Sequence, residues 1–327
     1  MTKEYNGVFV FAEQKSGEIH RVSYELIAKG RQLADKLEEP VICGVLGPKD
    51  MDIQELIQKG ADVVYYVEDE MFNSPEEIIY SKNIVKLLEK IKPEICLFGA
   101  TAFGRSLAPR VASALKTGLT ADCTGLEIDE EDGKLIQIRP AFSENILAHI
   151  KSSNMPQMST VRYKEFDEDE SNPDLTGKVI REKPYVEKYD LVKVLQELEQ
   201  QDINISEAKV VVSAGQGLKS KEDFMLIKEL ADALGGVVGS SRPLVDEGFI
   251  QKSHQVGYSG NRVKPKLYIA CGISGAPQHL AGMKDSEIIL AINTDPSAPI
   301  FNIADYGIVG DIYDVVPQLI NKIKCTK

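Results

Sequence analysis

The stretch that says most about the fold and the site of this chain is Leu267-Tyr-Ile-Ala-Cys-Gly-Ile-Ser-Gly-Ala-Pro-Gln-His-Leu-Ala-Gly282. The stretch begins with an apolar run that predicts a strand, passes through a Gly-Ile-Ser-Gly turn and opens a short helix. A second apolar run follows and ends at Asn293. Backbone N–H groups at the start of a helix, with glycines that let a ligand approach the main chain, form a cradle for phosphate. The stretch predicts an α/β fold with a nucleotide-type site, although the pattern recurs across many such folds.

A second glycine-rich turn, Gly215-Gln-Gly217, also follows an apolar run and precedes a helix pattern. A dinucleotide-binding fingerprint is found in this context. The third glycine of that fingerprint is missing, because Ser220 stands in its place. Since a Gly-x-Gly alone is as often a tight turn as a phosphate site, the sequence does not support an ordinary NAD-type Rossmann site.

Strand and helix patterns alternate over residues 1–120, which is typical of a parallel sheet flanked by helices. Strands are expected at 7–12, 41–46, 63–67 and 94–98, and helices at 23–37, at 53–59 and from Ser74 to a Lys92-Pro93 stop. Ser74, Pro75 and Glu77 match a capping box with Ser74 as the N-cap. Residues 124–190 contain hairpin-like runs and are expected to complete the sheet of the first domain.

A polar segment at 196–207 is the expected linker, and a second α/β unit begins after it. This unit has strand patterns at 209–213, 236–239, 267–271 and 288–292, and helix patterns at 224–234 and 312–324. A chain of 327 residues is longer than one core usually grows. We therefore expect two domains, 1–200 and 207–327, each built on a largely parallel sheet flanked by helices, the second of them Rossmann-like.

The composition excludes some classes of protein. A formal net charge of −12 argues against a nucleic-acid partner, which needs a basic face. No apolar run of about 18 residues is present, so no membrane insertion is expected. The first residues lead into a strand pattern without the basic and apolar segments of a presequence, and we expect a cytoplasmic protein.

The five cysteines, Cys43, Cys96, Cys123, Cys271 and Cys325, are widely separated along the chain. None of their spacings is typical of a zinc or iron–sulfur site, so no metal site is expected. Four of them lie in apolar runs or beside small residues, where buried, reduced thiols are expected.

Several blocks together resemble the alpha subunit of electron transfer flavoproteins. The opening stretch, with its Gln278-His279 pair, resembles the signature of that family. Further family-like blocks follow in family order at 211–219, 239–248, 255–260 and 295–311. These blocks cover most of residues 207–327, and Gly99–Arg110 is a weaker match to the other domain of the family.

The resemblance implies that the second domain binds FAD and that the first domain contacts a beta subunit in a heterodimer. The residues implied to bind FAD are Gln216, Ser241, Arg242, Val256, Gly257, Tyr258, Ser259, Ser274, Gly275, Ala276, Pro277, Gln278, His279, Asn293, Asp311 and Ile312. No catalytic residue is expected, because such a chain carries electrons and transforms no substrate by itself.

Three side chains are implied to lie beside the isoalloxazine ring. Arg242 would lie against the ring, where a planar and permanently charged guanidinium stabilises the reduced, anionic flavin. His279 would donate at the N1/C2-carbonyl edge, and Ser259 would lie near N5. Taken alone, an arginine is more often a solvated surface charge or part of an ion pair, and a single histidine is usually a core or surface residue without a special role.

The rest of the cofactor is implied to lie along Gln216, near the pyrophosphate or ribityl group, and to end at Asn293 and Asp311. Asp311 directly precedes a helix pattern, so it is also a candidate N-cap, and the two roles can coexist. Pro277 departs from the family, many members of which carry Ile or Val there. Proline lacks an N–H, so this position supplies no backbone donor to the cradle.

The implied function is electron transfer between dehydrogenases or NADH and a redox partner, with a flavin dehydrogenase such as an acyl-CoA dehydrogenase as one candidate. A more specific form of this function is flavin-based electron bifurcation, with a second FAD in the beta subunit. One alternative is an NAD(P)-dependent oxidoreductase or a transhydrogenase-like protein. Another is a non-redox nucleotide-binding module, which would leave Arg242, Ser259 and His279 unexplained. A tightly bound yellow cofactor would separate the flavoprotein from both.

Overall fold

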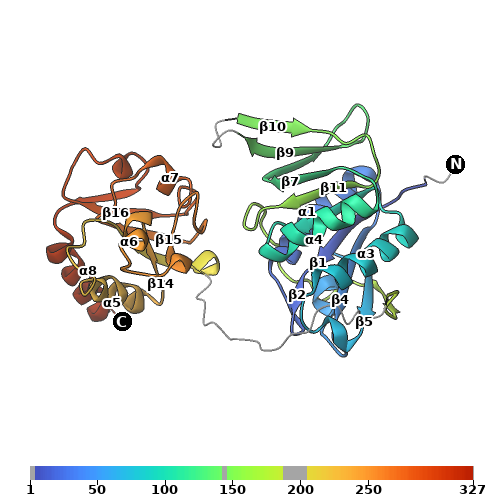
Figure 1. Ribbon diagram of the computed structural model, residues 1–327, viewed down its shortest axis with the longest axis horizontal. Coiled ribbons are helices and arrows are strands. Elements are labelled where there is room, and N and C mark those ends of the chain that lie inside the picture. The colour runs from blue at the N-terminus through green and yellow to red at the C-terminus, as the bar shows by residue number, and fades with distance from the viewer. Residues whose placement is uncertain (1–3, 142–145, 187–204, 327) are drawn as a thin grey trace. The chain divides into compact units, whose positions relative to one another are not determined.

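The chain divides into two compact units, Met1–Val194 and Leu195–Lys327, in a computed structural model that describes residues 4–141, 146–186 and 205–326 (Figure 1). Most of the expected linker, and with it the expected domain boundary, lies outside the described residues. Of that segment, Ile205–Glu207 forms a short 3-10 turn, η2. Each unit is described by itself below.

The first unit is built on a seven-stranded parallel sheet with the order β12-β5-β4-β1-β6-β11-β7. Its strands are β1 (Val8–Ala12), β4 (Val41–Gly47), β5 (Val63–Glu68), β6 (Ile95–Gly99), β7 (Leu119–Cys123), β11 (Gln157–Val161) and β12 (Lys178–Glu182). Its helices are α1 (Val22–Leu37), α2 (Gln54–Gln58), η1 (Glu70–Phe72), α3 (Glu77–Ile91) and α4 (Ala102–Ala114). Parallel strands need crossover connections, which these helices provide.

Alternate side chains of β1 enter two different cores. Val8 and Val10 pack with residues of α1 and α2 on one face of the sheet, while Phe9 and Phe11 pack with residues of α3 and α4 on the other. Because successive side chains of a strand point to opposite faces, a strand buried on both sides reads as an unbroken apolar run. The expected α/β fold, a parallel sheet flanked by helices, is confirmed.

The described residues between 124 and 186 only partly join this sheet. β11 and β12 extend it, as expected, but β8 (Gly125–Ile128), β9 (Leu135–Ala141) and β10 (Ile146–Ile150) form a separate antiparallel sheet of three strands. A short antiparallel hairpin follows β1. It consists of two strands of two residues each, β2 (Gln14–Lys15) and β3 (Glu18–Ile19). The expected hairpin around Glu131–Gly133 is the β8–β9 turn.

The start of α3 differs from the prediction. The N-cap is Glu76, whose carboxylate accepts hydrogen bonds from the N–H groups of Ile78 (3.3 Å) and Ile79 (3.1 Å). The predicted start at Ser74 and Pro75 was therefore wrong, because the longer Glu76 side chain reaches the free N–H groups from a position two residues further on. The helix ends at Lys92, as expected, with a left-handed backbone.

The second unit contains a five-stranded parallel sheet with the order β14-β13-β15-β16-β17. Its strands are β13 (Val210–Ala214), β14 (Val237–Ser240), β15 (Leu267–Cys271), β16 (Ile289–Asn293) and β17 (Tyr306–Val309). Its helical segments after η2 are α5 (Phe224–Leu234), α6 (Arg242–Asp246), η3 (Lys252–His254), α7 (Pro277–Leu280), η4 (Pro299–Asn302) and α8 (Ile312–Thr326). The sheet confirms the expected Rossmann-like arrangement.

The two faces of this sheet are covered differently. On one face, Val212 and Ala214 pack against apolar residues of α5 and α8. On the other, Val211, Tyr268 and Ala270 pack against loop residues and short helical segments. The loop-covered face therefore carries Tyr268, whose polar tip is considered below.

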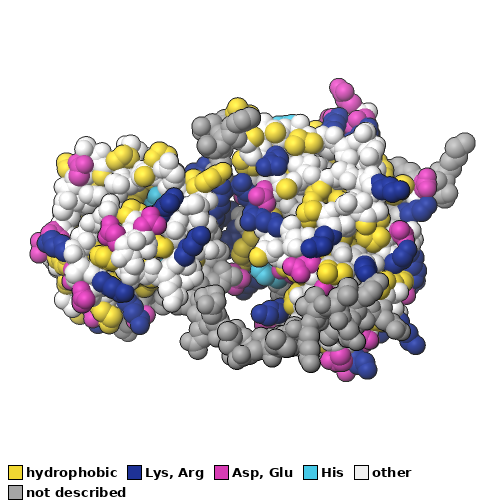
Figure 2. Space-filling model, viewed as in Figure 1, with side chains coloured by type: hydrophobic (Ala, Val, Ile, Leu, Met, Phe, Trp, Pro, Cys, Tyr) yellow, Lys and Arg dark blue, Asp and Glu magenta, His cyan; other side chains and the backbone are white. Residues whose placement is uncertain are grey.

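Four cysteines, Cys43, Cys96, Cys123 and Cys271, are buried free thiols as expected, and Cys325 is exposed. Among the described residues, no helix combines the length and the apolar content that a bilayer crossing requires. On the face shown in Figure 2, basic and acidic side chains are interspersed over each unit, with no large area of one sign.

Candidate functional site

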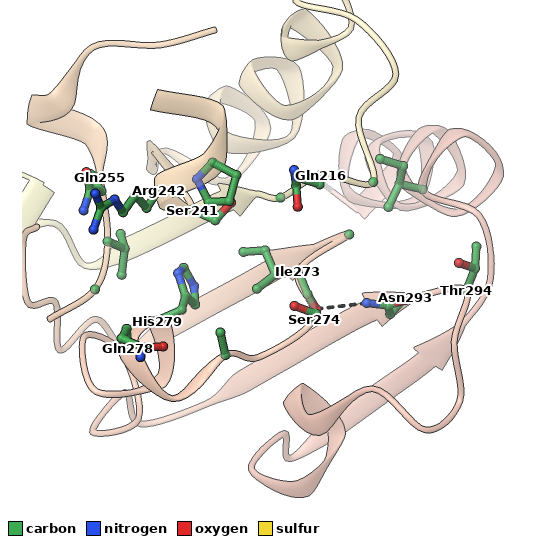
Figure 3. Close-up of a pocket in the computed structure, with 18 of the residues that line it drawn as sticks. Gln216, Ser241, Arg242, Gln255, Ile273, Ser274, Gln278, His279, Asn293 and Thr294 are labelled. Atoms are coloured by element: carbon green, nitrogen blue, oxygen red, sulfur yellow. Dashed lines mark hydrogen bonds between the residues drawn. The ribbon is translucent and has the colours of Figure 1, made fainter. Parts of the chain in front are cut away.

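A cavity of about 760 Å³ lies at the carboxyl edge of the second unit's sheet. Loops that follow each of the five strands contribute to it, together with the segment 255–259 (Figure 3). Ligands of open α/β sheets bind outside the carboxyl ends of the strands, at points where the strand order reverses. Here β14 and β15 lie on opposite sides of β13, so the cavity lies where that rule places a ligand.

Glycine backbone forms one wall of the cavity. The N–H of Gly217 donates to the carbonyl of Gly272 over 3.1 Å, and the N–H of Gly215 donates to the carbonyl of Cys271 over 2.9 Å. A Cβ on Gly217 would lie 2.7 Å from the Cα of Gly272, which is closer than real Cβ contacts. Only glycine fits this contact, and the backbone is left open to a ligand.

Asn293 joins the ends of two neighbouring strands. Its side-chain amide donates to the carbonyl of Ile273 over 2.9 Å, and its carbonyl oxygen accepts from the N–H of Asp295 over 2.9 Å (Figure 3). Both bonds fix the loops around the cavity. Asn293 therefore shapes the site as well as lining it.

His279 lines the cavity from α7 and is only 6% exposed. Its Nε2 lies 2.9 Å from the Tyr268 hydroxyl, and its Nδ1 is buried without a hydrogen-bond partner among the described residues. Burial lowers the pKa of His279 to about 4, and the nearby Val256 backbone offsets only part of this. The imidazole is therefore neutral at pH 7, with a single N–H.

Two cations border the cavity, and both have acidic neighbours. Arg242, whose side chain is 67% exposed, lies 3.2 Å from Asp246. Lys219 lies 3.9 Å from Asp311 and stacks over the ring of Tyr313 at 4.5 Å. Exposed ion pairs of this kind contribute little stability. These cations can therefore leave their acidic neighbours and bind an anionic ligand with little loss of free energy.

Asp311 caps α8, as the sequence allowed, and it lies at the cavity, while its contact with the adenosine stays a prediction. Its carboxylate accepts from the N–H of Tyr313 over 3.0 Å, which caps α8, and the residue also lines the cavity. Gln216 donates to Glu247 over 3.1 Å, and Ser259 accepts from Gln255 over 3.0 Å.

The two ends of the cavity differ in character. In Figure 3, His279, Arg242 and Gln255 lie toward one end and Asn293 and Thr294 toward the other. An elongated ligand can thus have one part beside a neutral imidazole and a guanidinium, and its other part beside amide and hydroxyl groups.

The structure brings together all the expected cofactor residues except Gly275 and Pro277, which do not line the cavity. Gly275 packs against η4, since a Cβ there would lie 2.4 Å from the Ile300 nitrogen. Pro277 is the first residue of α7. Each of the two lies next to a lining residue, and their expected contact with the cofactor stays a prediction.

Other lining residues are absent from the expected set, namely Gly215, Gly217, Lys219, Pro243, Gln255, Gly272, Ile273, Thr294 and Gly310. Most of them directly flank a predicted residue. The Gly-x-Gly turn itself signalled the first two. Among the described residues, no group of three or more His, Cys, Asp or Glu side chains is placed to hold a metal ion.

Two family models match the chain. The electron transfer flavoprotein domain matches residues 8–186, and the electron transfer flavoprotein FAD-binding domain matches residues 204–284.

Relatives of known name match over nearly the whole chain. An electron transfer flavoprotein subunit alpha from Thermoanaerobacterium thermosaccharolyticum is 47% identical, with 99% of each chain covered. One from Megasphaera elsdenii is 45% identical, covering 99% of this chain and 98% of the relative. The lactate dehydrogenase (NAD(+),ferredoxin) subunit LctC of Acetobacterium woodii is 44% identical, covering 98% of this chain and 77% of the relative.

Proposed function

Because this chain belongs to the electron transfer flavoprotein family, as an alpha subunit that binds FAD, we propose that the cavity at the carboxyl edge of its second unit holds the cofactor. The isoalloxazine ring lies at the end with His279 and Arg242, and the adenosine at the end with Asn293 and Asp311. The observation that carries this proposal is the buried Nδ1 of His279, a cavity residue, which has no hydrogen-bond partner among the residues that the structure describes.

The residues present fit such a cofactor in three ways. The volume of about 760 Å³ is within the range for cofactor and ligand sites, roughly 300–1,000 Å³. The glycine wall at Gly217 and Gly272 admits a ligand to the backbone, as a pyrophosphate requires. The unpartnered Nδ1 supplies a donor or acceptor that a polar ring edge can complete.

FAD supplies the redox chemistry, since its flavin ring takes up and releases electrons one or two at a time. The residues of this chain set how readily it does so. Arg242 places a permanent positive charge near the ring. His279, neutral and shielded from water, offers a hydrogen bond where negative charge develops. Both residues favour the reduced cofactor.

Other residues orient the cofactor. Ser259, held by Gln255, is assigned to the N5 side of the ring. The Gly215–Gly217 turn and Gln216 are assigned to the pyrophosphate or ribityl part, with Lys219 as the nearby cation. Asp311 and Asn293 are assigned to the adenosine, where a carboxylate can accept from ribose hydroxyls.

The chain forms a heterodimer with a beta subunit and acts as an electron carrier. We assign the contact with that subunit to the first unit. The chain alone transforms no substrate, and a flavin dehydrogenase, such as an acyl-CoA dehydrogenase, donates or accepts the electrons. The similarity to a subunit of an NAD(+)- and ferredoxin-linked lactate dehydrogenase also supports a place in a bifurcating complex.

The test is to co-produce the chain with its beta subunit, count flavin per heterodimer and follow visible absorbance during stepwise anaerobic reduction. One FAD that reduces in a single range of potential supports an ordinary carrier. Two FADs with separated reduction steps support bifurcation. A colourless heterodimer that takes up no added FAD would contradict the proposed site.

A further inference from the structure

Tyr268 lies directly behind His279 in the second unit. It belongs to β15 and is fully buried, and its hydroxyl lies 2.9 Å from His279 Nε2. The ring centroids are 6.2 Å apart and the rings are tilted by 56°. Tyr268 does not line the cavity, so it can affect a bound cofactor only through the histidine.

The direction of this hydrogen bond follows from the surroundings of the phenol. The phenolic oxygen lies within hydrogen-bond distance of His279 Nε2. The Ser213 hydroxyl lowers the pKa of Tyr268 in part, against the larger effect of burial, as a hydrogen-bond donor to the phenolic oxygen does. If Nε2 carried the proton, the phenolic O–H would have to donate to Ser213, and the buried Ser213 hydroxyl, which has no other partner among the described residues, would then have no acceptor for its own proton.

The phenol therefore donates and Nε2 accepts. A neutral imidazole has one N–H, and the hydrogen bond made by one nitrogen determines which nitrogen carries the proton. The remaining nitrogen, Nδ1, is buried and has no hydrogen-bond partner in the described ranges of the chain.

We propose that Tyr268 is a positioning residue that holds His279 as the Nδ1–H tautomer, so that the histidine presents a donor to the cofactor in the cavity. This inference rests on the proposed FAD site. A donor at Nε2 also polarises the imidazole and strengthens Nδ1–H as a donor. Tyr268 thus raises the tendency of the bound cofactor to accept electrons without touching it.

The first test reads the tautomer directly. The heterodimer is labelled with 15N-histidine, of which this chain has four, and the His279 signals are identified by their loss in His279→Gln. Spectra are recorded with FAD and after FAD has been removed. The wild type is expected to show a protonated Nδ1 and an unprotonated Nε2 in both states. Protonation at Nε2 in the wild type would overturn the proposal, whatever the variants do.

Tyr268→Phe removes only the hydroxyl and keeps the ring in the core. It is expected to protonate Nε2 in a measurable fraction of FAD-free molecules. Tyr306→Phe is the matched control, because Tyr306 is 65% exposed on the edge strand β17, and it is expected to leave the signals unchanged. An unaltered tautomer in Tyr268→Phe would also overturn the proposal.

The second test is a double-mutant cycle on the first reduction potential. Tyr268→Phe is expected to disfavour one-electron reduction by up to tenfold, which is 59 mV. It should have no further effect in a His279→Ala background, because the two residues act as one unit. Equal shifts in both backgrounds would show that Tyr268 acts on general packing. If the heterodimer bound no FAD, the proposed function would fail, while the FAD-free spectra would still decide the tautomer.

Discussion

Gly217 and Gly272 hold two strand-end loops in direct backbone contact, with the N–H of one donating to the carbonyl of the other over 3.1 Å. Gly272 has a φ of +63°, in the left-handed region, and a Cβ on it would lie 2.7 Å from the Cα of Gly217. The contact closes one wall of the cavity without any side chain.

Gly272→Ala is expected to separate these loops and to lower the flavin content of the purified heterodimer. The added methyl meets backbone, which cannot move aside as a flexible side chain can. Gly235→Ala is the matched control, since Gly235 has nearly the same φ of +65° and open space around its Cβ position. The control should lose about 1 kcal/mol of stability and keep its flavin. Equal flavin loss in both variants would show that backbone strain, and not the contact, is responsible.

The stability of the second unit is expected to fall on acidification because of His279. Burial lowers its pKa to about 4 from an ordinary value of 6.5, so between these pH values the unfolded chain binds more protons than the folded one. Stability is thus present above pH 6.5 and is lost as the pH falls toward 4. The loss between pH 7 and 5 is roughly 2 kcal/mol.

Urea unfolding of the FAD-free heterodimer at both pH values measures this effect. His279→Gln should remove most of the acid sensitivity, whereas His149→Gln, which changes an exposed histidine of the first unit, should not. The assignment of the acid sensitivity to His279 fails if the glutamine variant keeps the full pH dependence.

Asn293→Asp is expected to weaken FAD binding about tenfold, which corresponds to 1.4 kcal/mol. The change removes the donor to the Ile273 carbonyl and adds a negative charge beside the cavity. Fluorescence titration of the FAD-free heterodimer with FAD gives the affinity. Asn302→Asp adds the same charge at an exposed position outside the cavity and should leave the affinity unchanged.

Arg242→Gln is expected to lower the first reduction potential by tens of millivolts, up to about 59 mV for a tenfold change in the one-electron equilibrium. The guanidinium is exposed and only weakly paired to Asp246, so it is available to the anionic form of the cofactor. Lys252→Gln removes an equal charge from η3, outside the cavity, and serves as the control. A potential that shifts equally in both variants would indicate an effect of net charge alone.

The sequence predicts the strands that are continuous apolar runs but gives no bounds for β7, β11, β12 and β17, for a physical reason. Strands buried on both faces, such as β1 and β4, are unbroken apolar runs that can be recognised without knowing their neighbours. β17 is an edge strand on which Tyr306 and Val309 are exposed, and its sequence shows no such run. The sequence therefore gives no indication of this strand.

The same division applies to the site. His279 and Arg242 belong to motifs and can be identified from local sequence. The contributions of Gly272 and Tyr268 depend on tertiary contacts. Gly272 acts through Gly217, which is distant along the chain, and Tyr268 acts through His279, which lies beyond a turn. Sequence patterns give residue types and local spacing, whereas these contacts exist only in the folded sheet.

The position of β12 at the edge of the first sheet has a consequence for synthesis. Strand β5, with its apolar Val63 and Val64, pairs with β12 on its outer side, and β12 is the last strand along the chain among the described residues of that unit. At about 5–20 residues per second, the ribosome needs on the order of ten seconds to pass from Glu68 to Lys178. During that time β5 has an open edge, which can pair with another nascent chain. When β12 is added, it brings Lys178 and Arg181 to the rim of the sheet, and Arg181 pairs with Glu68. Molecules truncated before this strand should therefore be the ones that aggregate.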